Sequence, residues 1–184
     1  MDRVTDRVRT FWFGDRPDTE HPWWFERSDA LDATIAREFT ADVEAAAKGL
    51  HDGLQDSPEG CVVLCILLDQ FPRHIWRGTA RAFATDARAL AVSRHAVARG
   101  FDGALAPVEK LFLYLPLEHA EDIAAQEQCV ALFQATGHAR WVDYAQRHRA
   151  IIARFGRFPH RNAALGRATT EEEAEFLTQP GSSF

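Results

Sequence analysis

An unbroken apolar segment, Cys61 to Leu68, constrains the fold of this 184-residue chain more than any other feature. It lies within a stretch from Glu59 to Gln70 that we expect to be a helix, capped by Ser57 and opened by Pro58. Because a helix that is apolar on every face must be covered on all sides, this one is expected at the centre of the molecule. The residue before a proline is pushed out of helical geometry, so Phe71-Pro72 is expected to end it.

The segments around this run have the apolar periodicity and the stop signals of further helices. We expect helices from Asp2 to Phe13, Ser28 or Asp29 to about Leu50, Ala80 to Arg99, Leu117 to Thr136, Ala139 to Phe155 and Thr170 to about Leu177, with a short helix from Pro107 that Pro116 interrupts. No segment alternates with period two for long enough to predict a strand. The sequence therefore predicts an all-α protein, a single helical domain over residues 1–184 built of antiparallel helix hairpins.

Aromatic residues flank the first loop, in Phe11-Trp12-Phe13 and in Pro22-Trp23-Trp24-Phe25. They suit a ligand platform, but aromatic clamps that hold a helix hairpin together are commoner, so we expect them in the core. The three cysteines, Cys61, Cys65 and Cys129, are odd in number and contain no C-x-x-C pair. We expect buried thiols in a reducing cytosol.

The formal net charge of −6 argues against non-specific binding to nucleic acid or to an anionic membrane, since both need a broad positive field. The N-terminus lacks an apolar signal core, and the apolar run is too short to cross a bilayer. A cytoplasmic location is expected. A chain of this length can bury a sufficient core by itself, so we expect no structural metal, and nothing in the sequence indicates a cofactor.

A first polar motif follows the apolar helix, where Asp69 is succeeded by Arg73, His74 and Arg77. A carboxylate at the C-terminal end of a helix faces the negative end of the helix dipole and needs a partner. The simplest interpretation is an Asp69–Arg73 ion pair that braces the turn. The alternative is that Asp69 orients an arginine or histidine that contacts a ligand.

A second motif comprises Glu118, His119, Glu121 and Asp122, which we expect to open the helix that starts at Leu117, with the three acids on one face. Acids in a first turn complement the helix N-terminus and need no other role. The alternative is a hard-metal or general-base site, with His119 near Asp122. Because the spacing is neither H-E-x-x-H nor D-x-D, the metal signal is weak and we expect no metal site.

The third motif is the glycine-bounded connector from Gly156 to Gly166, which contains Arg157, Pro159, His160, Arg161 and Asn162. Arginine forks suit carboxylate or phosphate groups, and the histidine and asparagine add directional hydrogen bonds. The alternative is a loop locked by salt bridges to the acids of the second motif. His148, on the apolar stripe of the preceding helix, is expected to be a hydrogen-bonded core residue unless it faces this connector. We expect the three motifs to meet in space.

Four ordered motifs resemble a known family. They are Leu68-Asp69-Gln70-Phe71-Pro72-Arg73, Phe112-Leu113-Tyr114-Leu115-Pro116-Leu117-Glu118-His119, Arg157-Phe158-Pro159-His160-Arg161-Asn162 with Leu165-Gly166-Arg167, and Pro180-Gly181-Ser182-Ser183-Phe184. From Phe11 to Phe184 the chain is similar to an uncharacterised, mainly bacterial family, the domain of unknown function 924. The resemblance implies tetratricopeptide-like, right-handed stacking of helix hairpins and no established activity. His74 and Ala120 replace an asparagine and a serine of the family pattern, which argues against Ser-His hydrolysis here.

Two functions of different classes follow, and we favour the first. In the first, a small anionic or peptide ligand binds a polar groove lined by Asp69, Arg73, Arg77, Glu118, His119, Arg157, His160, Arg161 and Asn162. In the second, a hydrolase-type enzyme uses Glu118 or Asp122 as base and His119 or His160 as acid. A third interpretation is that the motifs only lock a scaffold or a homodimer. The C-terminal Phe184 is expected either to fray or to dock in the same groove.

Overall fold

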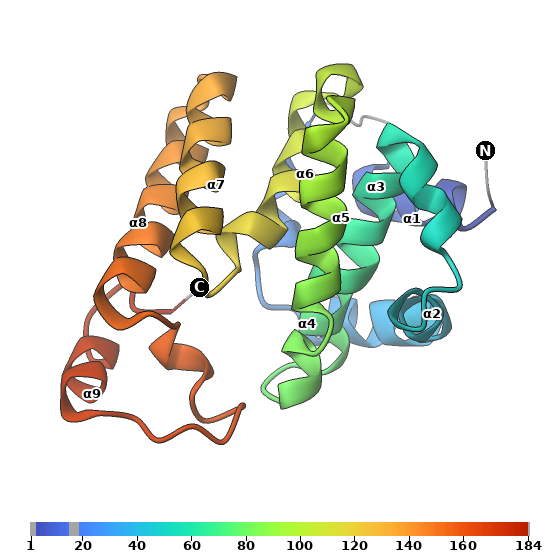
Figure 1. Cartoon of the computed structure of the whole chain (residues 1–184). Helices are drawn as coiled ribbons and strands as arrows, with labels where there is room; N and C mark the ends of the chain where they lie inside the picture. The colour runs from blue at the N-terminus through green and yellow to red at the C-terminus, as the bar shows by residue number, and fades with distance from the viewer. Residues whose placement is uncertain (1–2, 15–18, 184) are drawn as a thin grey trace.

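The computed structural model describes residues 3–14 and 19–183, and every regular element within those ranges is helical (Figure 1). The predicted all-α class is confirmed. The α-helices are α1 (Arg3–Phe13), α2 (Asp29–Ala47), α3 (Pro58–Cys65), α4 (Phe71–Ile75), α5 (Asp86–Ala98), α6 (Pro107–Glu118), α7 (Ile123–Thr136), α8 (Ala139–Phe155) and α9 (Glu171–Leu177). The expectations for Asp2 and for docking of Phe184 fall outside the described residues.

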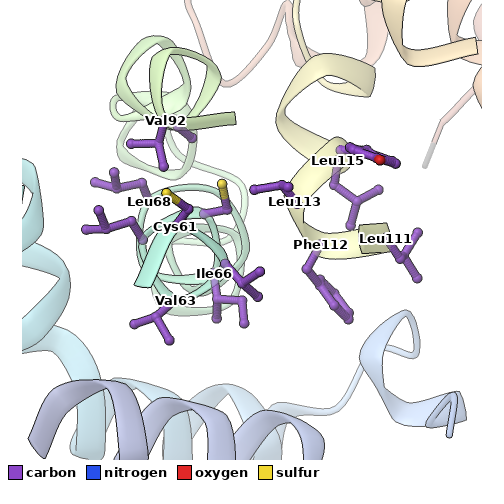
Figure 2. Packing of buried hydrophobic residues seen from close by; sticks show 14 of the residues in the cluster. Cys61, Val63, Ile66, Leu68, Val92, Leu111, Phe112, Leu113 and Leu115 are labelled. Carbon is purple, nitrogen blue, oxygen red and sulfur yellow. The ribbon is translucent and has the colours of Figure 1, made fainter. Parts of the chain in front are cut away.

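The apolar run lies at the centre of the molecule, as predicted. α3 packs against α1, α5 and α6, and no residue from Cys61 to Leu68 is more than 1% exposed. Figure 2 shows the run between Val92 of α5 and Leu113 of α6. The buried thiols are also confirmed, since all three cysteines are free and buried. α3 thus forms the axis against which the surrounding helices pack.

The central helix does not end before Pro72, and this prediction was wrong. The chain continues from α3 through a π-helical turn, Ile66–Gln70, directly into α4, and Phe71 has helical angles of φ −59° and ψ −37°. Pro72 has no N–H to donate to the carbonyl of Leu68, which would be its partner in an α-helix. The hydroxyl of Thr85 donates to that carbonyl instead, at 2.5 Å. Turns of this kind are frequent at functional sites, and this one holds Asp69.

The second proline also fails to interrupt its helix, contrary to the prediction. α6 runs through Pro116 and ends at Glu118, whereas Asp122 caps the start of α7. The side-chain amide of Gln126 donates to the carbonyls of Glu118 and Ala120, at 2.5 and 2.8 Å, so the carbonyls after Pro116 have partners. Glu118 and Asp122 therefore belong to different helices and do not share a face.

The predicted helix from Ala80 is divided into a 3-10 segment, Ala80–Phe83, and α5, which begins at Asp86. Thr85 precedes α5 but makes no side-chain cap, because its hydroxyl is used by Leu68. Other predicted boundaries are confirmed: Ser28 and Ser57 cap α2 and α3, Thr170 and Glu173 form a capping box, and α8 has the predicted limits.

The aromatic residues of the first loop are mostly in the core, as predicted. Trp12, Phe13 and Trp24 are at most 2% exposed, and each packs against Phe112 of α6 with ring centroids 4.7 to 5.6 Å apart. Phe25 is the exception at 59% exposed, so the prediction was wrong for that ring. The cluster ties the N-terminal segment to α6.

α7 and α8 pack side by side as an antiparallel hairpin (Figure 1). After α8, the chain turns back through the 3-10 segment Pro159–Arg161, where Arg161 contacts Asp86 at the start of α5, and then reaches α9. The tetratricopeptide-like stacking stays a prediction. Within the described ranges, no helix has both the length and the apolar character needed to cross a membrane.

Candidate functional site

The centre of the polar site is Asp69, whose side chain is almost completely buried. Both of its carboxylate oxygens lie 2.9 Å from Nδ1 of His119, and Oδ1 lies 3.1 Å from Nη1 of Arg73, which confirms the predicted ion pair. Gln70 also donates to Oδ2, at 2.5 Å. Burial alone would raise the pKa of Asp69, but the charge of Arg73 and the hydrogen bonds from His119 and Gln70 hold that pKa below its usual range. Asp69 is therefore a buried anion.

Asp86 extends this centre toward the connector. Arg73 donates to both of its oxygens, at 3.0 and 3.1 Å, and Nη1 of Arg161 donates to Oδ2 at 3.3 Å. Sequence reasoning missed Asp86, because a single acid in an amphipathic segment gives no signal of a site. The two carboxylates and two guanidiniums form a continuous chain from α4 to the connector.

The arginine at the end of this chain, Arg161, is only 6% exposed and poorly satisfied. Its contact with Asp86 is its one side-chain hydrogen bond to the described residues, and its Nε is buried without a partner. The guanidinium carbon lies 4.8 Å from the ring centre of Phe83 and 4.5 Å from that of Phe158. Burial and the charge of Arg73 lower the pKa of Arg161 to about 10, so it remains charged at neutral pH.

A second group of titratable side chains adjoins Asp69. One carboxylate oxygen of Glu118 and one ring nitrogen each of His119 and His148 lie within 4.8 Å of one another. Glu118 and His148 are 4% and 3% exposed, and Oε2 of Glu118 has no hydrogen-bond partner. Burial and the charge of Asp69 raise the pKa of Glu118 to about 8, whereas burial and His119 lower the pKa of His148 to about 3. Both histidines are neutral, since burial also lowers the pKa of His119.

His148 was expected to be a hydrogen-bonded core histidine, and this is confirmed. Its Nδ1 lies 2.9 Å from the backbone carbonyl of Tyr144. It also faces the connector, because its ring centroid is 5.6 Å from that of Phe158. His148 is therefore both a core histidine and a neighbour of the connector, so it belongs to the candidate site.

The three predicted motifs meet, as expected. His119 joins the second motif to Asp69, and the backbone amide of Phe158 joins the connector to Glu121 at 2.8 Å. Half-buried His160 lies beside Phe158, with the ring centroids 5.6 Å apart, and burial together with Arg161 lowers its pKa to about 4. The connector therefore forms one wall of the site.

Four of the predicted site residues make their contacts away from Asp69 and Asp86. Arg77 is engaged by Asp32, with two contacts of 2.8 Å, and Arg157 by Glu173, at 2.6 and 2.9 Å. Asn162 hydrogen-bonds to Glu173 and Thr169, which attaches the connector to α9. Asp122 is exposed and paired with Arg94 at 3.0 Å. The structure places these four outside the Asp69 and Asp86 chain.

The described residues also form an open groove between α1 and α2, whose lining includes Arg7, Phe11, Glu38 and Phe39. Arg7 is already paired with Asp42 at 3.1 Å and donates to the Glu38 carbonyl at 2.9 Å. None of the groove residues belongs to the polar cluster, so we place the candidate site at the cluster.

Comparison with known proteins agrees with the resemblance seen in the sequence. A family model described as a bacterial protein of unknown function, DUF924, matches residues 8–181. No curated protein matches the chain. Among solved structures, a protein of unknown function from Agrobacterium tumefaciens is similar, with 41% sequence identity and a TM-score of 0.86 over 95% of this chain and 96% of that one.

Proposed function

The chain belongs to this bacterial family of unknown function, and we propose that it binds a small anionic ligand, a carboxylate or a phosphate, through Arg161. One observation carries the proposal. A guanidinium has five N–H donors, yet Arg161 makes a single side-chain hydrogen bond, of 3.3 Å, within the described residues while it is 6% exposed. Because buried polar groups are normally satisfied, an acceptor that completes this set would be strongly favoured.

The neighbouring arginines show what a satisfied guanidinium looks like in this protein. Arg73 contacts both oxygens of Asp86, and Arg167 contacts both oxygens of Glu121 at 2.6 and 2.9 Å. Each of these two guanidiniums makes two hydrogen bonds to one carboxylate. Arg161 shares Asp86 with Arg73, so two cations compete for one anion there. An anionic ligand would give Arg161 an acceptor that it does not share with Arg73.

Groups around Arg161 suit an anionic ligand. The side chains of Arg73 and His119 retain 20% and 16% exposure, so a ligand can contact the cluster from solvent. His160 is next to Arg161, and either nitrogen of its neutral ring can carry the proton that is donated to a ligand. Arg161 and Arg73 together offer directional N–H donors beside two positive charges, which is the pattern that recognises carboxylate and phosphate groups.

Replacing Arg161 with methionine is expected to abolish stabilisation by anions. Inorganic phosphate and citrate should raise the melting temperature of the wild type, and a Kd one hundredth of the ligand concentration corresponds to about 2.7 kcal/mol. The empty Arg161→Met protein should be as stable as the wild type, or more so, because Asp86 keeps Arg73 and methionine suits the gap between two phenyl rings.

Arg149→Met serves as the control, because Arg149 pairs with Glu127 on the surface. Its response to anions should match that of the wild type. Equal anion-induced shifts in the wild type and in Arg161→Met would contradict the proposal.

A hydrolase-type activity is the second candidate, and the Asp69–His119 pair favours it. A carboxylate on Nδ1 fixes the tautomer and orientation of a histidine so that Nε2 can act as a general base. Glu118 lies beside His119. Asp122 is at the surface and paired with Arg94, so it does not act as the base. Ester, phosphate and amide substrates should then be turned over by the wild type and not by His119→Asn. Equal rates in both proteins would exclude this activity.

A further inference from the structure

We propose that Glu118, His119 and His148 form a binding site for a divalent transition-metal ion, with Zn²⁺ as the representative case. One carboxylate oxygen and two imidazole nitrogens lie within 4.8 Å of one another. Two histidines and a carboxylate are a ligand set that proteins use for zinc and for non-haem iron. The inference does not depend on anion binding at Arg161.

The hydrogen bonds behind the two histidines prepare them as ligands. Nδ1 of His119 faces the carboxylate of Asp69, and Nδ1 of His148 faces the carbonyl of Tyr144. Both partners are acceptors, so each Nδ1 carries the proton, and Nε2 is the nitrogen through which each neutral ring would bind an ion. A histidine with a carboxylate or backbone carbonyl on its other nitrogen is the usual arrangement behind a metal ion.

Glu118 supplies the third ligand. Its side chain is 5% exposed, and Oε2 is buried with no hydrogen-bond partner. Its nearest cationic or ring partner is Nδ1 of His148, which lies 3.5 Å from Oε1 and already faces Tyr144. A buried carboxyl without hydrogen bonds is costly, and a bound cation would offset that cost.

The spacing suits an ion after small side-chain rotations. Ligand atoms at about 2.1 Å from a tetrahedral ion are about 3.4 Å apart, so groups that lie within 4.8 Å need to approach one another by at most about 1.4 Å. The 16% exposure of the His119 side chain gives the ion a route from solvent, while Glu118 and His148 are covered. Imidazole ligands favour zinc-like ions over Mg²⁺ or Ca²⁺. Three protein ligands leave one position for water or an oxygen of an anion.

The test is calorimetric titration of chelator-treated full-length protein with Zn²⁺, together with the visible spectrum of the Co²⁺-loaded protein. We expect one ion per chain, a raised melting temperature and the absorption of four-coordinate Co²⁺. Glu118→Gln and His148→Gln should weaken binding by at least about 100-fold, since even residues behind the ligands contribute about 10- to 100-fold.

The matched control is His95→Gln, because His95 bonds to the Gln55 carbonyl outside the cluster. It should bind Zn²⁺ like the wild type, and so should Arg161→Met, which separates this site from the proposed anion site. Far-ultraviolet circular dichroism of the metal-free variants verifies that each one folds. Absence of Zn²⁺ binding by the wild type, or unchanged binding in folded Glu118→Gln, would overturn the proposal.

Discussion

Replacing Asp69 with asparagine is expected to lower the free energy of unfolding by about 3 kcal/mol or more. Asparagine has nearly the same shape, so the change removes the charge with little effect on packing. The loss leaves Arg73 with only Asp86, which it shares with Arg161, and leaves His119 without its carboxylate partner. Removing one member of a buried ion pair is costly because the other charge stays buried. Urea unfolding followed by tryptophan fluorescence measures the change.

Asp122→Asn is the matched control for this prediction. Asp122 pairs with Arg94 at the surface, and exposed pairs contribute about 1 kcal/mol or less. Asparagine also caps a helix as well as aspartate does, so the start of α7 should be unaffected. If Asp69→Asn cost no more than Asp122→Asn, Asp69 would not be the anion that holds the cluster together.

Phe112→Ala should destabilise the protein by about 3–5 kcal/mol, the usual range for loss of a buried phenyl ring. Phe112 is 0% exposed and contacts Trp12, Phe13 and Trp24, so the cavity would open where the N-terminal segment joins α6. The rings around it cannot all move in to fill the space. Thermal or urea unfolding gives the measurement.

The control is Leu50→Ala, because Leu50 is 73% exposed. We expect a change within about 0.5 kcal/mol for this surface substitution. A loss in Phe112→Ala as small as that in Leu50→Ala would show that the aromatic cluster is not part of the stabilising core.

The helical class and the central position of the apolar run could be predicted, because both follow from local composition and periodicity. The proline positions could not be predicted. Pro72 and Pro116 both lie within continuous helix, and the Leu68 carbonyl that Pro72 leaves without a donor accepts from Thr85, which comes from another segment. A side chain that arrives from another helix leaves no trace in the local pattern.

The same distinction applies to the site. The motif around Asp69 and His119 could be identified because its polar residues break an apolar pattern, and the expected meeting of the three motifs is confirmed by the contacts of His119 and Phe158. Asp86 and the role of His148 beside Glu118 could not be identified, since both depend on how α5 and α8 pack. From spacing alone we expected no metal site. The proposed site could not be seen in the sequence because it combines residues at the end of α6 with His148 of α8.

The central claim is that Arg161 binds an anionic ligand, and its Nε–H resonance tests this most directly. In a two-dimensional ¹H–¹⁵N spectrum of the arginine side chains, addition of phosphate should shift the Arg161 signal saturably. The Nε–H signal of Arg157, already bonded to Glu173 at 2.6 Å, should stay in place. Assignment follows from the loss of one signal in Arg161→Met. An Arg161 signal that does not move, or that moves no more than that of Arg157, would contradict the account.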